Sequence, residues 1–359
     1  MRKIKGPAIF LAQFMADEAP FSDLGLIASW SAGIGFKGVQ IPTWDMRCFD
    51  LEKAATSQTY CDEISGICEE AGVEITELST HLQGQLVAVH PAYDELCSAF
   101  TPPDFKGDSK QRTEWAIQQL LFAAQASERL GIKMHATFSG AFLWHMFYPW
   151  PQRPAGMVDE GFKELARRWR PILDEFQEHG VGVCFELHPG EDLHDGVTFE
   201  RFLDAVDQHP AAQILYDPSH FLLQQLDYLA FIDIYHERIG AFHVKDAEFR
   251  PSGRAGVYGS YSGWIDRPGR FRSIGDGQID FGAIFSKLTQ YDFPGWAVLE
   301  WECCLKDSEQ GAIEGARHIE EFIIDVAKRS FDDFAGADSD AKRNRRLLGL
   351  GDDDTAPGG

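Results

Sequence analysis

Residues 180–220 read GVGVCFELHPGEDLHDGVTFERFLDAVDQHPAAQILYDPSH. The stretch passes from an apolar run at 181–187, through an amphipathic segment at 198–208, to a second apolar run at 213–216. Both runs show little polar alternation, which is typical of parallel strands buried on both faces. Each run ends in charged or imidazole side chains. The stretch therefore predicts a strand, a helix and a second parallel strand, with polar groups at the carboxyl ends of the strands.

The same unit recurs along the chain. Apolar runs of strand length occur at residues 8–14, 38–42, 73–79, 133–138, 181–187, 213–216, 239–244 and 296–300. Amphipathic segments lie between them, at residues 51–71, 111–130, 160–179, 198–208, 226–237, 281–290 and 311–328. Glycines stand where helix C-caps are expected, at Gly72, Gly131 and Gly180, and capping residues precede two helices, at Asp195 or Thr198 and at Asp280.

Eight strands that alternate with helices predict an α/β fold, a closed (β/α)8 TIM barrel. A doubly wound open sheet is the second interpretation, and it is weaker because no Gly-x-Gly-x-x-Gly motif follows any of the runs. We expect residues 1–330 to form a single catalytic barrel domain. Residues 331–359 are expected to form a partly ordered C-terminal tail.

Composition excludes several classes of protein. The chain has 359 residues, 44% of them hydrophobic, and 33 Lys+Arg against 56 Asp+Glu give a net charge of −23. This charge argues against nucleic acid or an anionic membrane as the partner, and no apolar run approaches the ~18 residues of a membrane-spanning helix. The seven cysteines include no Cys-x-x-Cys pair, which favours free thiols in a reducing, cytoplasmic setting.

Three connections are too long for simple turns, at residues 83–111, 139–159 and 247–278. All three leave the carboxyl ends of strands, where barrel enzymes build their active sites. The second connection is rich in aromatic residues, which can close over a sugar or pack against a second subunit of a homo-oligomer. We expect Trp144 to line the substrate pocket and His135 to lie beneath it, with residues 148–154 facing a partner subunit.

Four consecutive strands end in carboxylates or imidazoles, in FELHP (185–189), YDPSH (216–220), FHVKD (242–246) and LEWE (299–302). Side chains alternate along a strand, so the first, third and fourth of these motifs each place two polar groups on one face. Each residue alone has an ordinary structural explanation, such as an ion pair with lysine. Together, unpaired carboxylates inside a barrel would repel one another unless a divalent cation joins them. Three carboxylates and one imidazole suit Mn²⁺, Mg²⁺ or Co²⁺ better than Zn²⁺.

Five motifs, in this order, make the chain resemble the sugar phosphate isomerase/epimerase family with its xylose isomerase-like TIM barrel: FELHPGE (185–191), YDPSH (216–220), FHVKD (242–246), GDGQIDF (275–281) and GWAVLEWE (295–302). The resemblance runs from the first strand to about Lys328. It implies one divalent metal ion, Mn²⁺ before Mg²⁺, Co²⁺ or Zn²⁺, with the ligands Glu186, Asp217, His243 and Glu300. It also implies that Glu186 and Glu300 form the acid/base pair.

The same resemblance implies that His188 and His220 contact the substrate. Family barrels often place an arginine shortly after the histidine of the seventh strand, whereas this chain has Lys245 and Asp246 there. We include Lys245, Asp246 and His81, with His135 and Trp144, among the expected substrate-binding residues.

The expected chemistry is proton transfer beside a carbonyl. A metal ion chelated by a carbonyl and an adjacent hydroxyl stabilises an enediolate, and a carboxylate on each face of a sugar can take and return the proton. The sequence therefore predicts a metal-dependent isomerase or epimerase of a sugar, keto-sugar or cyclitol. Because no glycine-rich phosphate loop is present, a neutral substrate is favoured.

Three alternatives remain. The same intermediate can expel a β-substituent, so the first is a dehydratase or lyase, similar to inosose dehydratase or cleaving a keto-glycoside. An endonuclease IV-like nuclease would need a richer ligand set for three zinc ions and a basic face for DNA, which the net charge disfavours. A sugar-binding barrel without activity would leave two facing glutamates unexplained.

Overall fold

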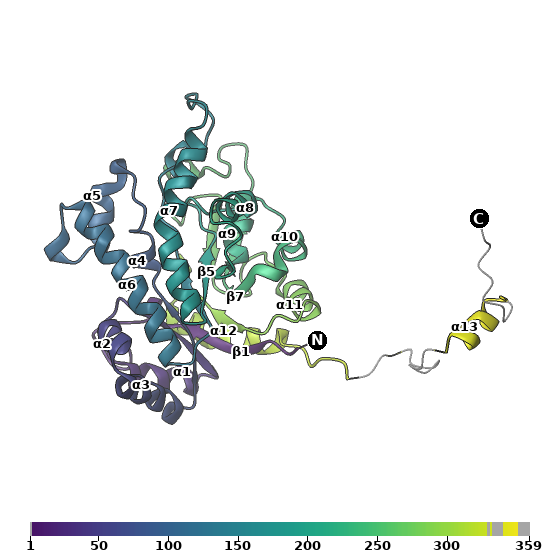
Figure 1. Ribbon diagram of the computed structural model, residues 1–359. Coiled ribbons are helices and arrows are strands. Elements are labelled where there is room, and N and C mark those ends of the chain that lie inside the picture. Colours follow the sequence, from purple (N-terminus) through teal and green to yellow (C-terminus); the bar gives the residue numbers. More distant parts are fainter. Residues whose placement is uncertain (1, 329–330, 332–339, 351–359) are drawn as a thin grey trace. The chain divides into compact units, whose positions relative to one another are not determined.

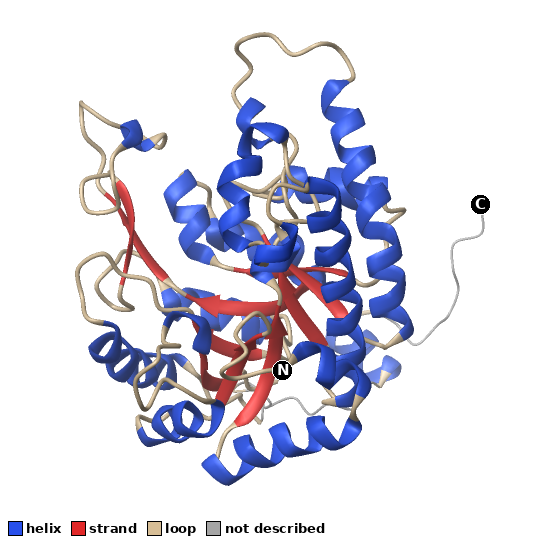
Figure 2. Cartoon of the chain, turned by 90° about the vertical axis from the view of Figure 1, so that its left-hand side faces the viewer, coloured by secondary structure: helices blue, strands red, loops and turns tan. Residues whose placement is uncertain are grey.

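Eight parallel strands close into a barrel that helices surround (Figure 2). The structure is a computed structural model and describes residues 2–328, 331 and 340–350. The strands are β1 (Lys5–Phe10), β2 (Gly38–Pro42), β3 (Glu74–Ser79), β4 (Met134–Thr137), β5 (Gly182–Glu186), β6 (Ala212–Tyr216), β7 (Ile239–Val244) and β10 (Trp296–Leu299). Their order around the barrel is β1-β10-β7-β6-β5-β4-β3-β2. The predicted TIM barrel is therefore confirmed.

Helices follow the strands and cover the barrel (Figure 1). The longer helices are α1 (Leu24–Gly33), α3 (Gln58–Ala71), α6 (Ser109–Arg129), α7 (Met157–Glu178), α8 (Gly196–Ala205), α10 (Tyr228–Tyr235), α11 (Phe281–Gln290) and α12 (Ser308–Phe322). The shorter ones are α2 (Leu51–Thr56), α4 (His81–Gly84), α5 (Asp94–Cys97) and α9 (Pro218–Gln224). Several of the predicted caps are present. Gly72 ends α3 with a positive φ of 86°, and Asp195 and Thr198 form a reciprocal capping box at α8.

The helical prediction differs from the structure in several places; the last predicted helix, 311–328, for example, ends at Phe322. The segment predicted as one helix, 51–71, is interrupted at Ser57, whose backbone is extended and whose hydroxyl accepts a hydrogen bond from the Tyr60 N–H. Serine competes for backbone hydrogen bonds in this way, and so it ends α2 and starts α3. The sequence analysis also places no helix at α1, although Asp23 caps it by accepting from the Leu26 N–H.

The first strand lies earlier than predicted. We expected a strand at residues 8–14, but β1 ends at Phe10 and the chain turns into a 3-10 helix, η1 (Leu11–Gln13). The amides of Phe14 and Met15 both donate to the Leu11 carbonyl, which closes this turn. The turn places Gln13 at the catalytic end of the barrel.

Side chains on the barrel strands alternate between the interior and the helices. Small and apolar residues fill the interior away from the carboxyl ends, including Ala136, Cys184, Leu215 and Ala241, which form one buried cluster. The outward side chains are large, and Phe185 of β5 packs edge-on against Trp169 of α7 at 4.7 Å. The next inward positions toward the carboxyl ends carry the polar residues. A layer of apolar side chains therefore lies beneath a layer of charged side chains inside the barrel.

The connection predicted as the loop 247–278 contains a hairpin. Strands β8 (Asp246–Phe249) and β9 (Gly269–Arg272) pair antiparallel beside the barrel (Figure 2). Glu248 on β8 forms ion pairs with Arg270 and Arg272 on β9 at 2.6 and 2.9 Å. The segment between these strands meets the aromatic loop that precedes α7, since the ring centroids of Phe147 and Tyr258 lie 5.8 Å apart.

Residues 1–324 form one compact unit. A second unit comprises residues 325–359, and its described part contains the short helix α13 (Ala341–Leu347), capped by Asp340. Most of the predicted tail, 331–359, lies outside the described residues. Within the described residues, all seven cysteines are free thiols, and no helix has the length and apolar character needed to cross a membrane.

Candidate metal and active centre

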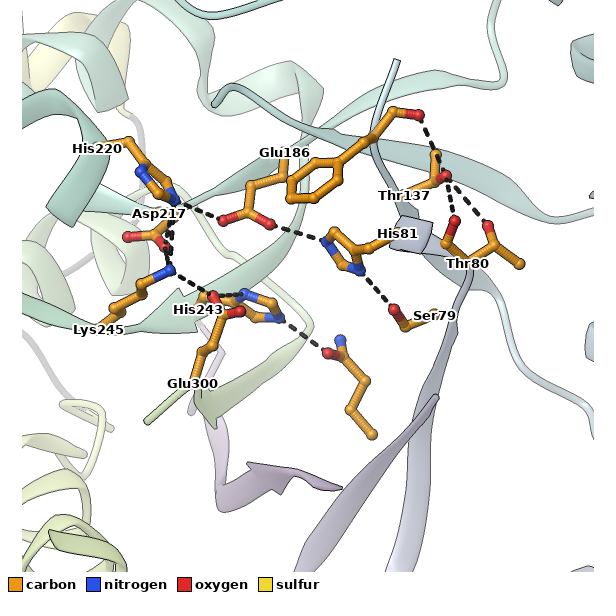
Figure 3. A network of polar contacts seen from close by, with 12 residues as sticks. Ser79, Thr80, His81, Thr137, Glu186, Asp217, His220, His243, Lys245 and Glu300 are labelled. Atoms are coloured by element: carbon orange, nitrogen blue, oxygen red, sulfur yellow. Dashed lines mark hydrogen bonds and ion pairs between the residues drawn. The ribbon is translucent and has the colours of Figure 1, made fainter. Parts of the chain in front are cut away.

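The four side chains expected to bind metal meet at the carboxyl ends of four neighbouring strands. Glu186 ends β5, Asp217 follows β6, His243 lies on β7 and Glu300 follows β10. Each offers one ligand atom, and these atoms all lie within 4.8 Å of one another. All four residues are buried. The structure thus brings together residues separated by more than a hundred positions in the sequence (Figure 3).

The environment of these four residues fits a cation. Among the described residues, none donates a hydrogen bond to the buried atom Oδ2 of Asp217. Its other oxygen, Oδ1, accepts from the Ser219 N–H at 2.8 Å, which orients the carboxylate. A buried carboxylate oxygen without a hydrogen-bond donor is costly, and the longer contacts of Oδ2 with His220 at 3.3 Å and Lys245 at 3.6 Å offset only part of a cost that a bound cation would remove. The donor set of carboxylate oxygens and one imidazole nitrogen is suited to a divalent metal ion.

Two histidines hold Glu186 from opposite ends of its carboxylate. His220 Nε2 lies 2.9 Å from Oε1, and His81 Nε2 lies 2.8 Å from Oε2 (Figure 3). Ser79 fixes His81 from behind, because its hydroxyl lies 2.5 Å from His81 Nδ1. Burial alone would raise the pKa of Glu186, but the contacts with His220 and His81 outweigh it and hold the pKa well below its usual range. Glu186 is therefore anionic at neutral pH.

Lys245 lies on the opposite side of the cluster from His81. Its Nζ is 3.2 Å from Glu300 Oε2, 3.0 Å from Glu302 Oε2 and 3.6 Å from Asp217 Oδ2. Burial would raise the pKa of Glu300, but Lys245 and then His243 lower it to about 2. Burial raises the pKa of Asp217 to about 6, against the opposing effect of His220 and Lys245. One ammonium ion thus faces several carboxylates, which leaves negative charge for a bound cation to balance.

Neutral side chains from distant strands complete the centre. His243 Nδ1 lies 2.9 Å from Glu300 Oε2, and its Nε2 donates to Gln40 Oε1 at 3.0 Å. Gln13 donates to Glu300 Oε1 at 3.1 Å. The sequence analysis did not single out Gln40 or Gln13. Neither lies in a recognisable motif, and only barrel closure brings Gln40 of β2 across the interior to His243 of β7, and Gln13 of η1 to Glu300 after β10.

A cavity of about 370 Å³ opens beside this centre. Its walls include Gln13, Trp264, Phe271, Trp301 and Glu302. Gln13 and Glu302 connect it to the cluster through their contacts with Glu300 and Lys245. Lys245 Nζ also lies 4.4 Å from the centroid of the Phe271 ring. The cavity offers aromatic faces and polar groups next to the cluster, which is the usual composition of a small-ligand pocket.

Four of the expected substrate contacts lie at or close to the centre, namely His81 and Lys245, whose contacts are given above, and His188 and His220. His188 packs against His220, with ring centroids 4.1 Å apart, and against Phe138 at 4.9 Å. His220 Nε2 faces Glu186 and also Asp217, at 3.3 Å from Oδ2. His220 is therefore placed to orient the carboxylates. Substrate contact by either histidine stays a prediction.

The other three expected contacts do not reach the ligand cluster. His135 faces outward on β4, with Nε2 2.7 Å from Thr80 Oγ1 and its ring against Phe176 of α7. Asp246 turns away from the cluster and accepts hydrogen bonds from the backbone amides of residues 247, 275, 277 and 279. Trp144 stacks on Phe147 at 4.9 Å and does not line this cavity. The structure thus brings neither His135 nor Asp246 to the centre, because strand alternation and backbone donors fix them elsewhere.

Comparison with known proteins identifies the family. The model of the xylose isomerase-like TIM barrel family matches residues 28–322. The chain belongs to this family. The resemblance found in the sequence is therefore confirmed.

The chain is also similar to two named relatives. An inosose dehydratase of Serratia proteamaculans is 27% identical over 290 residues, which cover 76% of this chain and 92% of the relative. An inosose dehydratase of Bacillus velezensis is 28% identical over 152 residues, so this match spans only 51% of that relative.

Two solved structures share the fold at low identity. The 3-keto-D-glucoside 4-epimerase of E. coli superposes with a TM-score of 0.58 at 15% identity, covering 85% of this chain and 97% of the other. A xylose isomerase-like TIM barrel protein of Mycobacterium smegmatis, solved in complex with magnesium, gives 0.59 at 13% identity, with coverage of 89% and 96%.

Proposed function

We propose that this protein is a divalent-metal-dependent dehydratase that acts on a keto-sugar or keto-cyclitol. The observation that carries the proposal is the convergence of Glu186, Asp217, His243 and Glu300 within 4.8 Å, buried at the catalytic end of the barrel. The named activity of the curated relatives, inosose dehydratase, favours loss of water as the outcome. The coarser conclusion, that the chain is an enzyme of the family's carbohydrate chemistry, rests on the same relatives.

The chain's own residues account for the proton movements. Glu186, an anion held between two histidines, takes the proton from the carbon beside the carbonyl. The departing β-hydroxyl receives that proton and leaves as water, so the net reaction is elimination. A divalent ion held by the four ligands, with Mn²⁺ the first candidate, would polarise the carbonyl and stabilise the developing enediolate charge. The adjoining aromatic cavity would exclude water from this carbanion-like species.

Isomerase or epimerase activity, the function predicted first from the sequence, is the second candidate. Glu186 and Glu300 both reach the centre from strands that β6 and β7 separate. An epimerase needs a carboxyl group on each side of the substrate, one to remove the proton and one to return it. Glu300 is the second group in that case.

Deuterium exchange distinguishes the two outcomes. The protein is freed of metal by chelation, reloaded with Mn²⁺, Mg²⁺, Co²⁺ or Zn²⁺, and incubated in D₂O with keto-inositols and keto-sugars under NMR observation. Dehydration gives an unsaturated or diketo product. Epimerisation gives deuterium at the inverted carbon with the number of hydroxyls unchanged. No exchange and no product with any loaded form would contradict the proposal.

A further inference from the structure

The cavity beside the metal centre carries two thiols that the proposed proton transfer does not use. Cys303 and Cys304 follow directly on Trp301 and Glu302, and all four residues line the cavity of about 370 Å³. Both cysteines are half-buried free thiols. They come shortly after the expected metal ligand Glu300 in the chain, so a change in their chemistry takes place in the pocket that a substrate would enter.

The surroundings of Cys303 stabilise its thiolate. The backbone amides of Leu305 and Lys306 both donate hydrogen bonds to its sulfur at 3.4 Å. Burial alone would raise the pKa of Cys303, but hydrogen bonds outweigh it and lower the pKa. The donors are the backbone amides of Lys306, Leu305 and Ser273 and the side chain of Arg272. Since the thiolate is the nucleophilic form of cysteine, these donors favour reaction at Cys303.

Five other cysteines lie in the opposite kind of environment. Burial raises the pKa of the thiol in Cys48, Cys61, Cys68, Cys97 and Cys184. Cys97 is the informative comparison, because it is half-buried like Cys303 but does not line the cavity. Partial exposure alone therefore does not distinguish Cys303. The hydrogen-bond donors around its sulfur do.

Cys304 places a second thiol next to this thiolate on the same cavity wall. The peptide bond between the two cysteines is trans, so their Cα atoms lie about 3.8 Å apart, closer than the ~4.4–6.8 Å of most disulfides. A disulfide between them would be strained and therefore easily reduced, as is typical of regulatory disulfides. A stabilised thiolate beside a second, resolving thiol is also the usual arrangement of a cysteine that peroxide oxidises.

We propose that Cys303 and Cys304 form a peroxide-sensitive modification site in the wall of the catalytic cavity. The Cys303 thiolate attacks one oxygen of hydrogen peroxide, the O–O bond breaks, and a sulfenic acid and hydroxide form. The Cys304 thiol then attacks the sulfenic sulfur, the S–O bond breaks, and a disulfide and water form. The two sulfurs together lose two electrons, which the peroxide accepts. A dithiol reductant returns both thiols.

The consequence is a reversible block of the cavity. The new S–O or S–S bond changes the segment 301–304, which forms much of the cavity wall. This segment includes Glu302, whose carboxylate lies 3.0 Å from the Lys245 ammonium group. Oxidation therefore acts on substrate entry and on the position of Lys245, and it removes none of the four expected metal ligands. The site goes beyond the proposed function, because its chemistry is independent of which substrate enters the cavity.

The test is a time course of thiol oxidation in the full-length protein. The protein is treated with a small molar excess of hydrogen peroxide, remaining thiols are alkylated at successive times, and the peptides are mapped by mass spectrometry. We expect Cys303 to be oxidised about tenfold faster than Cys97 in the same molecule, because the thiolate is the reacting form. The peptide that holds Cys303 and Cys304 should lose two hydrogens, and dithiothreitol should restore them.

Two variants separate the roles of the two thiols. In Cys304→Ser the disulfide cannot form, so dimedone should trap the sulfenic acid on Cys303. In Cys303→Ser the remaining Cys304 should stay reduced at the same dose of peroxide. Cys97→Ser is the matched control and should be oxidised as wild type is. Thermal melting shows whether each variant is folded, and the comparison of Cys303 with Cys97 in wild type needs no variant.

Equal oxidation rates of Cys303 and Cys97 would overturn the inference, as would oxidation of Cys304 in Cys303→Ser or a wild type that never forms the disulfide. The mapping needs no turnover, so it decides the inference even where no keto-substrate reacts, a result that contradicts only the proposed function. Where the Mn²⁺-loaded protein does turn over a keto-substrate, oxidation should lower kcat/KM of the wild type about tenfold until dithiothreitol is added. Undiminished turnover by fully oxidised wild type would refute the block.

Discussion

At the residue scale, Lys245 lies buried among carboxylates, and its positive charge offsets part of their mutual repulsion. Its ammonium group contacts Glu300, Glu302 and Asp217. Removing one member of a buried ion pair costs about 3–5 kcal/mol, because the remaining charges lose their partner. Lys245→Met keeps the length of the side chain and removes the charge. We expect this variant to melt at a clearly lower temperature than wild type without metal, and to recover most of the loss when Mn²⁺ is added.

Lys287→Met is the matched control for this experiment. Lys287 pairs with Asp233 at 2.6 Å on the partly exposed surface, where ion pairs contribute about 0–1 kcal/mol. Its melting temperature should change little and should respond to Mn²⁺ as wild type does. A Lys245→Met protein as stable as the control without metal would show that Lys245 does not balance the carboxylates.

Gln40 fixes which nitrogen of His243 faces the cluster. Because its Oε1 accepts the Nε2–H at 3.0 Å, Nδ1 is left to bind metal beside Glu300. Loss of such an orienting partner typically weakens metal binding by about 10–100-fold. We expect Gln40→Leu to raise the Kd for Mn²⁺ within that range in isothermal titration. Gln85→Leu is the control, because it removes a part-buried amide next to α4, and it should leave the Kd for Mn²⁺ unchanged. Equal Kd values for the two variants would reject the role of Gln40.

At the scale of elements, the segment between β5 and α8 holds the loop after β4. Gly140 N–H donates to Glu191 Oε2 at 2.5 Å, and the amides of Phe142 and Leu143 donate to the two oxygens of Asp192 at 2.7 and 2.8 Å. Burial raises the pKa of Glu191 to about 8, well above the ordinary value of a glutamate carboxyl group. In the folded protein, Glu191 is therefore mainly the protonated, neutral acid at neutral pH.

This shift predicts the direction in which stability depends on pH. A carboxyl group whose pKa is raised by folding contributes stability that is fully present below about pH 4.5 and is lost as the pH rises through about 8. Glu191→Gln replaces the acid by a neutral amide that does not titrate. We expect its melting temperature to fall less than that of wild type between pH 6 and pH 9. Glu114→Gln, at an exposed position, should follow wild type, and parallel curves for wild type and Glu191→Gln would contradict the assignment.

The barrel elements could be predicted because their signals are local. Buried parallel strands read as short apolar runs, and Ile239–Val244 and Gly38–Pro42 match the predicted bounds. The hairpin β8–β9 could not be found in this way, because its pairing joins residues that a long connection separates. The interruption at Ser57 depends on a single side-chain hydrogen bond, which periodicity does not reveal.

The site could be predicted only in part, for a related reason. Carboxylates and imidazoles at strand ends carry a visible signal, and the structure gathers Glu186, Asp217, His243 and Glu300 as the family resemblance implied. Neutral partners such as Gln40 carry none, since any glutamine on a strand has the same appearance in the sequence. His135 shows the opposite error. An imidazole near a strand end attracts attention, yet the alternation of β4 turns it toward Phe176.

At the scale of the whole molecule, one cavity opens beside a buried cluster of carboxylates, and the chain as a whole carries a charge of −23. This charge disfavours an anionic substrate. The expectations of a cytoplasmic location, a homo-oligomer and a substrate-facing Trp144 stay predictions.

The most direct test of the account is the rate at which deuterium from the solvent is incorporated beside the carbonyl of a keto-substrate, followed by NMR in D₂O. Three samples are compared: protein freed of metal by chelation, the same protein reloaded with Mn²⁺, and the Asp217→Asn variant treated with Mn²⁺. Asp217 is the informative position because its role is to hold the ion and not to carry the proton. The account predicts rapid exchange in the reloaded wild type and at least a hundredfold slower exchange in the chelated protein and in Asp217→Asn. Equal exchange with and without metal, or undiminished exchange in Asp217→Asn, would contradict it.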